Sequence, residues 1–203
     1  MLSNASVEEA KADIEEKGFH KVDDPEIGSK IDLMRANEQS FYFSEQSGFD
    51  FCRDHILLNT YIQGILSALS ADAGSQYLLV NQATLAPDQG HIYTLRDGGK
   101  QIDWLIVQAW PKNSRVTFYA GSHKADKLQR SPSSNRFWEV AKADLLQNGC
   151  KAENCIFDQG GLMIFDARAC FEREQERSYH YAYVRLPILN GLLEKGLGIY
   201  RKR

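Results

Sequence analysis

The sequence is poor in cysteine and has no long apolar run. Its cysteines lie singly, without a CxxC pair, at Cys52, Cys150, Cys155 and Cys170. We therefore expect free thiols in a reducing compartment rather than a disulfide framework or a zinc site. No stretch approaches the ~18 apolar residues that span a bilayer, and residues 1–17 are too acidic for a secretory signal or a transit peptide. A cytoplasmic protein is expected.

An excess of positive charge is also absent. The formal net charge is -3 over 203 residues, which gives no electrostatic reason to expect a nucleic acid or a membrane as partner. The sequence has no glycine-rich phosphate loop ahead of a helix, no GxSxG elbow and no HExxH pair. Phosphate-loop nucleotide binding, serine hydrolysis at such an elbow and zinc proteolysis are therefore not predicted.

The composition that remains is that of a globular domain. Hydrophobic residues make up 43% of the chain and charged residues 25%, which are ordinary values for soluble proteins. The chain has no internal repeat, no low-complexity tract and no convincing linker. We therefore expect one domain over 1–203, with a helical N-terminal part (1–75), a β-core (76–187) and a C-terminal tail (188–203).

Helical signals gather in the first third of the chain. Ser6, three residues before Glu9, fits a capping box at the start of a helix. Apolar residues at helical spacing predict a second helix within 56–69. The segment 34–50 has no clean period and is expected to be irregular. A further helix is predicted within 135–147, inserted between strands.

Short runs of β-branched and aromatic residues dominate from residue 76 on. Turn formers such as Asp97-Gly98-Gly99 and Gln159-Gly160-Gly161 separate them. The predicted strands lie at 77–80, 102–109, 115–119, 155–157, 162–165 and 179–186. This spacing favours a mainly β fold, a sandwich or a jelly roll, with the N-terminal and inserted helices packed outside.

Three motifs carry a resemblance to a known family. The chain opens with a predicted helix that ends in Gly-Phe, continues with two strands that lead into Gly121-Ser122-His123-Lys124, and later has the strand Gly161–Arg168, which ends in Phe-Asp-Ala-Arg. In this order it resembles the phytanoyl-CoA dioxygenase family of non-haem iron and 2-oxoglutarate oxygenases. The resemblance covers most of the chain and implies a double-stranded β-helix of eight strands, with helices on one outer side.

The same resemblance locates the iron ligands, and two of the three are replaced. That family holds iron with a His-x-Asp pair and a later His, which leave positions open for cosubstrate and oxygen. The matching positions here are His91, Tyr93 and Phe171. A phenol is a poor substitute for a carboxylate, and a phenyl ring cannot bind a metal. The resemblance therefore implies a degenerate member that binds neither iron nor 2-oxoglutarate, with His91 at the mouth of the barrel.

Acid–base chemistry without iron stays open as a function. His91, Tyr93 and His180 are the candidate groups, because imidazole titrates near neutral pH. Such a chain would be an isomerase or cyclase acting on a natural-product intermediate. A plain ligand-binding role and an active oxygenase in another register are further alternatives.

Aromatic residues point to a partner instead. Strict alternation along 179–185 puts three tyrosines on one face of a strand. These tyrosines would line a pocket, form an interface or belong to an ordinary half-buried strand. The interface candidates are Phe41, Phe43, Phe49, Tyr179, Tyr181 and Tyr183. Our first hypothesis is a catalytically degenerate subunit that pairs with an intact, homologous iron and 2-oxoglutarate oxygenase in specialised-metabolite biosynthesis. The iron and the 2-oxoglutarate would then belong to the partner.

Overall fold

The computed structural model describes residues 4–70 and 76–195 of the chain. Within these ranges the strands are β1 (Phe19–Asp23), β2 (Tyr77–Leu85), β3 (Tyr93–Thr94), β4 (Trp104–Trp110), β5 (Ser114–Ala120), β6 (Arg130–Pro132), β7 (Trp138–Val140), β8 (Lys151–Phe157), β9 (Gly161–Asp166), β10 (Cys170–Gln175) and β11 (Ser178–Arg185). The α-helices are α1 (Asn4–Glu16), α2 (Pro25–Ala36), α3 (Gln46–Cys52), α4 (Thr60–Leu69), α5 (Lys142–Gln147) and α6 (Leu186–Glu194).

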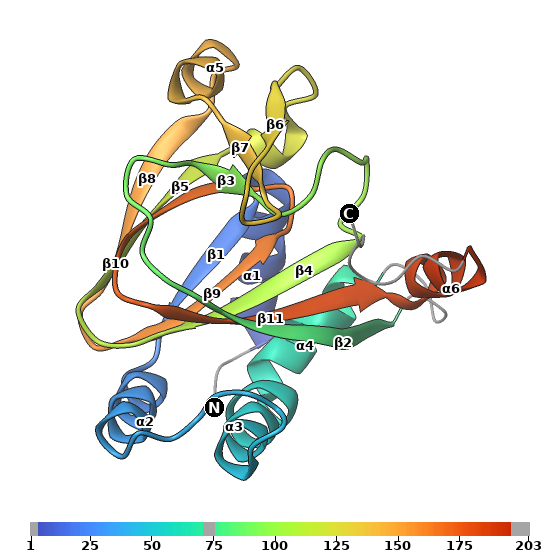
Figure 1. Ribbon diagram of the computed structural model, residues 1–203. Helices are drawn as coiled ribbons and strands as arrows, with labels where there is room; N and C mark the ends of the chain where they lie inside the picture. Colours follow the sequence, from blue (N-terminus) through green and yellow to red (C-terminus); the bar gives the residue numbers. More distant parts are fainter. Residues whose placement is uncertain (1–3, 71–75, 196–203) are drawn as a thin grey trace.

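The strands form two antiparallel sheets that enclose an interior (Figure 1). One sheet has five strands in the order β1-β9-β4-β11-β2, and the other has six in the order β6-β7-β3-β10-β5-β8. Without β1 in the first sheet and β6 and β7 in the second, four strands remain in each. The fold is therefore mainly β, the jelly roll that the sequence predicts, with helices packed outside.

Local side-chain chemistry explains where the helices of the outer layer begin. The Asp24 carboxylate accepts hydrogen bonds from the backbone N–H groups of Glu26, at 3.0 Å, and Ile27, at 3.1 Å, while Pro25 takes up the first turn of α2. Asn59 caps α4 in the same way. These two caps fix the points at which the chain turns into the helical layer.

Several local predictions are wrong. The segment 34–50 is not irregular throughout, because α2 extends into its start and α3 begins within it. The helix expected over 135–147 is β7 followed by the short α5, since β7 pairs with both β6 and β3. The helix expected over 56–69 is interrupted, because a π-helical turn (Arg53–Leu57) precedes the Asn59 cap of α4.

The boundaries of the predicted parts also shift. The N-terminal part is not purely helical, because β1 joins β9 at the edge of the five-stranded sheet. The predicted tail begins within a helix, α6, whose partly buried apolar residues pack against the interior near Trp104 and Val184. None of the helices in the described ranges is long and apolar enough to cross a membrane.

The helical layer covers the outer face of the five-stranded sheet. Its apolar side chains pack on the outward residues of β4, β9 and β11, and Figure 1 shows α2, α3 and α4 on that side. The inward residues of both sheets form a second apolar cluster that includes Phe118, Phe165 and Phe171. Each strand of the five-stranded sheet thus alternates between the helical layer and the interior.

The tyrosines of β11 belong to the core under this helical layer. Tyr179, Tyr181 and Tyr183 are 3%, 0% and 2% exposed, and the ring of Phe41 stacks on that of Tyr179 at 3.6 Å between centroids. Their predicted role as an interface is therefore wrong for these three tyrosines and for Phe41, because the N-terminal helices already cover them.

Candidate functional site

The structure brings together the positions at which the resemblance locates the iron ligands. Tyr93 in β3 and Phe171 in β10 are direct partners across the antiparallel pair, and His91 lies two residues before Tyr93. Phe171 is fully buried, and its ring centroid lies 5.4 Å from those of both Phe118 and Phe165. An aromatic cluster therefore fills the interior beside Tyr93.

A carboxylate that the sequence motifs do not reveal joins these residues. Asp88 accepts a hydrogen bond from the Tyr93 hydroxyl at 2.8 Å and lies 2.9 Å from His91 Nδ1. The Arg173 guanidinium approaches the same carboxylate, with Nη2 3.4 Å from Oδ2. We call Asp88, His91, Tyr93 and Arg173 the Asp88 cluster. It contains two of the three predicted acid–base residues.

The loop that carries Asp88 is held against β10 by hydrogen bonds. The backbone N–H of Asp88 donates to the carbonyl of Arg173 at 2.8 Å, and that of Gly90 donates to the Glu172 carboxylate at 2.8 Å. Asp88 is thus fixed in place by the strand that supplies Arg173, and the turn Pro87–Gly90 delivers His91 to the start of β3.

The Asp88 cluster runs from solvent into the interior. The His91 side chain is 51% exposed, that of Asp88 33% and that of Arg173 only 6%. Burial, together with the bond to Asp88, raises the pKa of Tyr93 to about 12, so its hydroxyl keeps its proton at neutral pH. Burial lowers the pKa of Arg173, whose guanidinium lies 5.5 Å from the Tyr93 ring centroid and 5.8 Å from that of Phe137.

His180, the third acid–base candidate, lies deeper and apart from the other two. It is 5% exposed, on the inward face of β11, and no hydrogen bond within the described ranges joins it to His91 or Tyr93. Burial, with a smaller contribution from the positive charge of Arg173, lowers its pKa to about 3. A neutral imidazole with so low a pKa is a weak base, so His180 is a poor candidate for a general base.

The residues at this site do not fit an iron ion. Phe171 offers no donor atom, the Tyr93 hydroxyl is engaged by Asp88, and His91 Nδ1 faces the same carboxylate. Among the described residues, no three His, Cys, Asp or Glu side chains are grouped so that they could hold a metal. That the chain binds neither iron nor 2-oxoglutarate stays a prediction.

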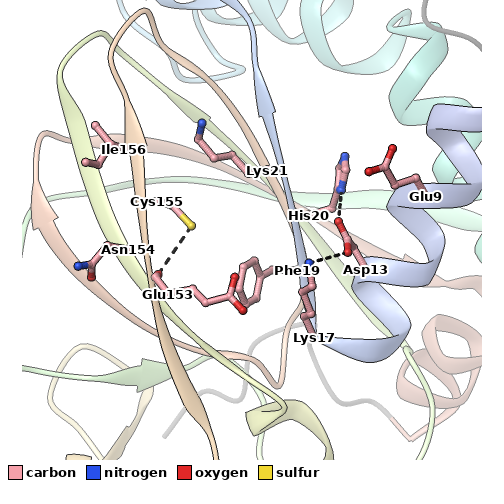
Figure 2. Close-up of a pocket in the computed structure, with 10 residues that line it drawn as sticks. All are labelled: Glu9, Asp13, Lys17, Phe19, His20, Lys21, Glu153, Asn154, Cys155 and Ile156. Atoms are coloured by element: carbon pink, nitrogen blue, oxygen red, sulfur yellow. Dashed lines mark hydrogen bonds and ion pairs between the residues drawn. The ribbon is translucent and has the colours of Figure 1, made fainter.

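A cleft of about 390 Å³ lies elsewhere, where α1 and β1 face β8 (Figure 2). Its basic side chains are all paired, since Lys17 and His20 both contact Asp13, at 2.9 and 2.8 Å, and Lys21 contacts Asp23 outside the cleft wall. Burial raises the pKa of the Cys155 thiol to about 11, so the thiol stays protonated at neutral pH. The cleft therefore presents neither a spare cation nor an activated nucleophile.

Comparison with known proteins gives the fold and no closer relationship. No family model matches the chain, and no curated protein matches its sequence. The structure resembles the non-heme alpha ketoglutarate dependent epimerase SnoN from nogalamycin biosynthesis, with a TM-score of 0.58 and 11% identity over 90% of this chain and 84% of that one. The carbocyclase SnoK from the same biosynthesis has a TM-score of 0.58 and 12% identity over 90% and 84%. Iron-bound HygX from Streptomyces hygroscopicus gives 0.54 and 10% over 92% and 88%. At these identities the likeness establishes a shared fold alone.

Proposed function

We propose that the chain is an iron-independent acid–base enzyme, an isomerase or cyclase that moves a proton on a small organic molecule at the Asp88 cluster. The observation that carries the proposal is the single carboxylate of Asp88, which bonds both His91 and Tyr93 at the solvent end of the interior. A carboxylate that orients an imidazole is the usual arrangement of a general base.

The hydrogen bonds support the following roles in the proposed reaction. An ionised carboxylate only accepts, so His91 Nδ1 carries the proton that it donates to Asp88, and Nε2 keeps its lone pair. Nε2 takes a proton from the substrate, and Asp88 stabilises the imidazolium that forms. Tyr93, a neutral phenol, donates a proton to a neighbouring substrate atom. His91, whose side chain is 51% exposed, releases the proton from Nε2 to solvent, Tyr93 regains a proton from solvent, and both residues return to their starting protonation.

The structural neighbours support this type of reaction without demonstrating it. SnoN is described as an epimerase and SnoK as a carbocyclase, both from nogalamycin biosynthesis and both alpha ketoglutarate dependent. The donor set at Asp88 does not fit iron. We therefore propose for this chain only the rearrangement of a natural-product skeleton, and we propose no oxidative step. A substrate from specialised metabolism is part of the proposal.

Hydrogen exchange in D₂O tests the proposal. The protein, with excess chelator, is incubated with a panel of ketones, lactones and hydroxy acids, and deuterium uptake at carbon is followed by NMR. We expect catalysed exchange into at least one compound, reduced 100-fold or more in His91→Gln and Asp88→Asn but not in the matched control His55→Gln. Equal rates in His91→Gln and the unchanged protein would overturn the proposal, as would the absence of exchange across the panel.

A second candidate function is the supporting subunit of an oxygenase. The observation that favours it is a group of exposed aromatic side chains on and before α3, with Tyr42 57%, Phe43 38% and Phe49 46% exposed. Large apolar groups on a surface are typical of protein interfaces. Phe43 and Phe49 are thus the two predicted interface residues that remain accessible.

A further inference from the structure

The interior of the jelly roll changes character along its strands. One end is apolar, with Phe171, Phe118 and Val184 among its side chains. The other end is polar, because the same inward faces continue with Arg173 in β10 and with His180 in β11. His180 lies opposite Gln108 of β4 in the sheet register. All three polar side chains are buried.

The polar end has more hydrogen-bonding groups than the protein satisfies. Within the described chain, buried atoms without a partner include Arg173 Nε, His180 Nδ1, Ser178 Oγ and both side-chain polar atoms of Gln108. Buried polar groups in folded proteins nearly always have a partner, and each orphan destabilises the fold. So many orphans on adjoining inward positions indicate a bound group that the protein chain itself does not supply.

We infer that the substrate of the proposed acid–base reaction is a carboxylic acid, whose carboxylate binds Arg173 at the polar end of the interior. This rests on the proposed function, since it names the class of molecule that reaches His91 and Tyr93. Among the described residues, the Arg173 guanidinium is the one buried cation at this end, and its planar fork matches a carboxylate. The Tyr93 and Phe137 rings hold it in a fixed orientation.

Charge and donor type favour a carboxylate over a neutral group. Asp88 offers Arg173 a contact of 3.4 Å and already bonds His91 and Tyr93, so it leaves the guanidinium incompletely paired. Arg173 Nε–H, the Gln108 amide N–H and the Ser178 hydroxyl are all donors, and a carboxylate has lone pairs for each of them. The carbon next to the bound carboxylate would then lie toward Asp88 and His91.

Binding of simple carboxylates, measured without any turnover, tests the inference. Benzoate and acetate are titrated into the ¹⁵N-labelled protein at pH 7, and the side-chain signals of Arg173, Gln108 and His180 are followed by NMR. We expect saturable shifts at all three residues, with affinity lowered at least tenfold in Arg173→Lys, which keeps the charge and loses the fork. The control Lys112→Gln, on the turn between β4 and β5, should bind as the unchanged protein does.

The outcomes separate this inference from the proposed function. Saturable shifts without deuterium exchange in any compound would uphold the carboxylate site and reject the acid–base reaction. Exchange only into neutral ketones, with no carboxylate binding, would uphold the acid–base reaction and reject the carboxylate site. The inference is overturned if neither benzoate nor acetate shifts these signals, if Arg173→Lys binds them equally well while still folded, or if only inorganic phosphate binds.

Discussion

Asp88 illustrates how single residues decide the chemistry of this molecule. It lies in a turn, three residues before His91, and its carboxylate contacts a histidine, a tyrosine and an arginine. Sequence motifs predict His91 and Tyr93 as candidates because a resemblance in sequence aligns them with iron-ligand positions. They do not reveal Asp88 or Arg173, since no motif covers a turn carboxylate, and the arginine comes from a strand 85 positions later. That contact exists only once β3 and β10 pair.

His180 predicts how acid destabilises the fold. Its pKa is about 3 in the folded protein, against about 6.5 in the unfolded chain. The folded state therefore binds fewer protons between these values, and its stability is full above pH 6.5 and falls as the pH decreases toward 3. We expect the free energy of unfolding, measured in urea, to fall by up to about 1.4 kcal/mol per pH unit below pH 6 from this residue.

The comparison that isolates His180 is with His180→Leu, because all other titrating groups are shared. The difference in unfolding free energy between the two proteins should change as the pH is lowered from 7 to 4.5. Over this range the variant should become more stable relative to the unchanged protein. A constant difference over this range would show that His180 protonates without cost, and hence that it is not buried as described.

Phe171 and Tyr93 allow a test of the missing metal site. We expect no stoichiometric Fe(II) in the unchanged protein after anaerobic loading, because a phenyl ring and an engaged phenol provide no ligands. In Tyr93→Asp/Phe171→His the two lost donors return beside His91, and we expect about one iron per chain by elemental analysis. Phe171→His alone serves as the control. Stoichiometric iron in the unchanged protein would refute the assigned register.

At the level of elements, the helical layer and β11 depend on each other. The outward face of β11 carries three tyrosines because a broad, flat apolar surface is needed beneath α2, α3 and α4. Their hydroxyls differ, however. Tyr179 accepts a hydrogen bond from Arg35 Nε at 3.0 Å, whereas the hydroxyls of Tyr181 and Tyr183 have no partner within the described chain.

This difference predicts the effect of removing each hydroxyl. Tyr179→Phe loses a bond from a charged donor and should lower the free energy of unfolding by about 1–3 kcal/mol. Tyr181→Phe removes a buried, unpaired hydroxyl, so it should leave the stability unchanged or raise it by up to about 1 kcal/mol. Urea denaturation of both variants measures these changes in the free energy of unfolding. A larger loss of stability in Tyr181→Phe than in Tyr179→Phe would mean that the Tyr181 hydroxyl has a partner.

Elements with strong local signals were the predictable part of the fold. The strands 102–109, 115–119, 162–165 and 179–186 are rich in β-branched and aromatic residues and lie within a residue or two of the observed β4, β5, β9 and β11. β3 and β7 are two and three residues long and carry no period of their own. They exist because neighbouring strands pair with them, which one sequence cannot show.

At the level of the whole molecule, one face is unlike the rest. Ten large apolar side chains of the described residues are exposed, and five of them lie between Tyr42 and Leu58, on or beside α3. The aromatic members of this group, which we call the α3 patch, are Tyr42, Phe43 and Phe49. Their neighbours Phe41 and Phe51 are buried against β11, so the patch sits on a rigid base.

The α3 patch predicts a partner, and an intact iron and 2-oxoglutarate oxygenase of the same fold is the one that the supporting-subunit hypothesis requires. A stable pair buries at least ~1,000 Å² around a few aromatic residues.

Co-expression with such an oxygenase should give one complex in size-exclusion chromatography and faster turnover by the partner. Phe43→Ser/Phe49→Ser should abolish both, because it removes apolar area from the centre of the patch. Leu146→Ser, at a more exposed apolar position on α5, should leave the complex intact. If the two chains elute separately, or if Leu146→Ser disrupts the pair as strongly as the double variant, the α3 patch is not the interface and the supporting role is lost.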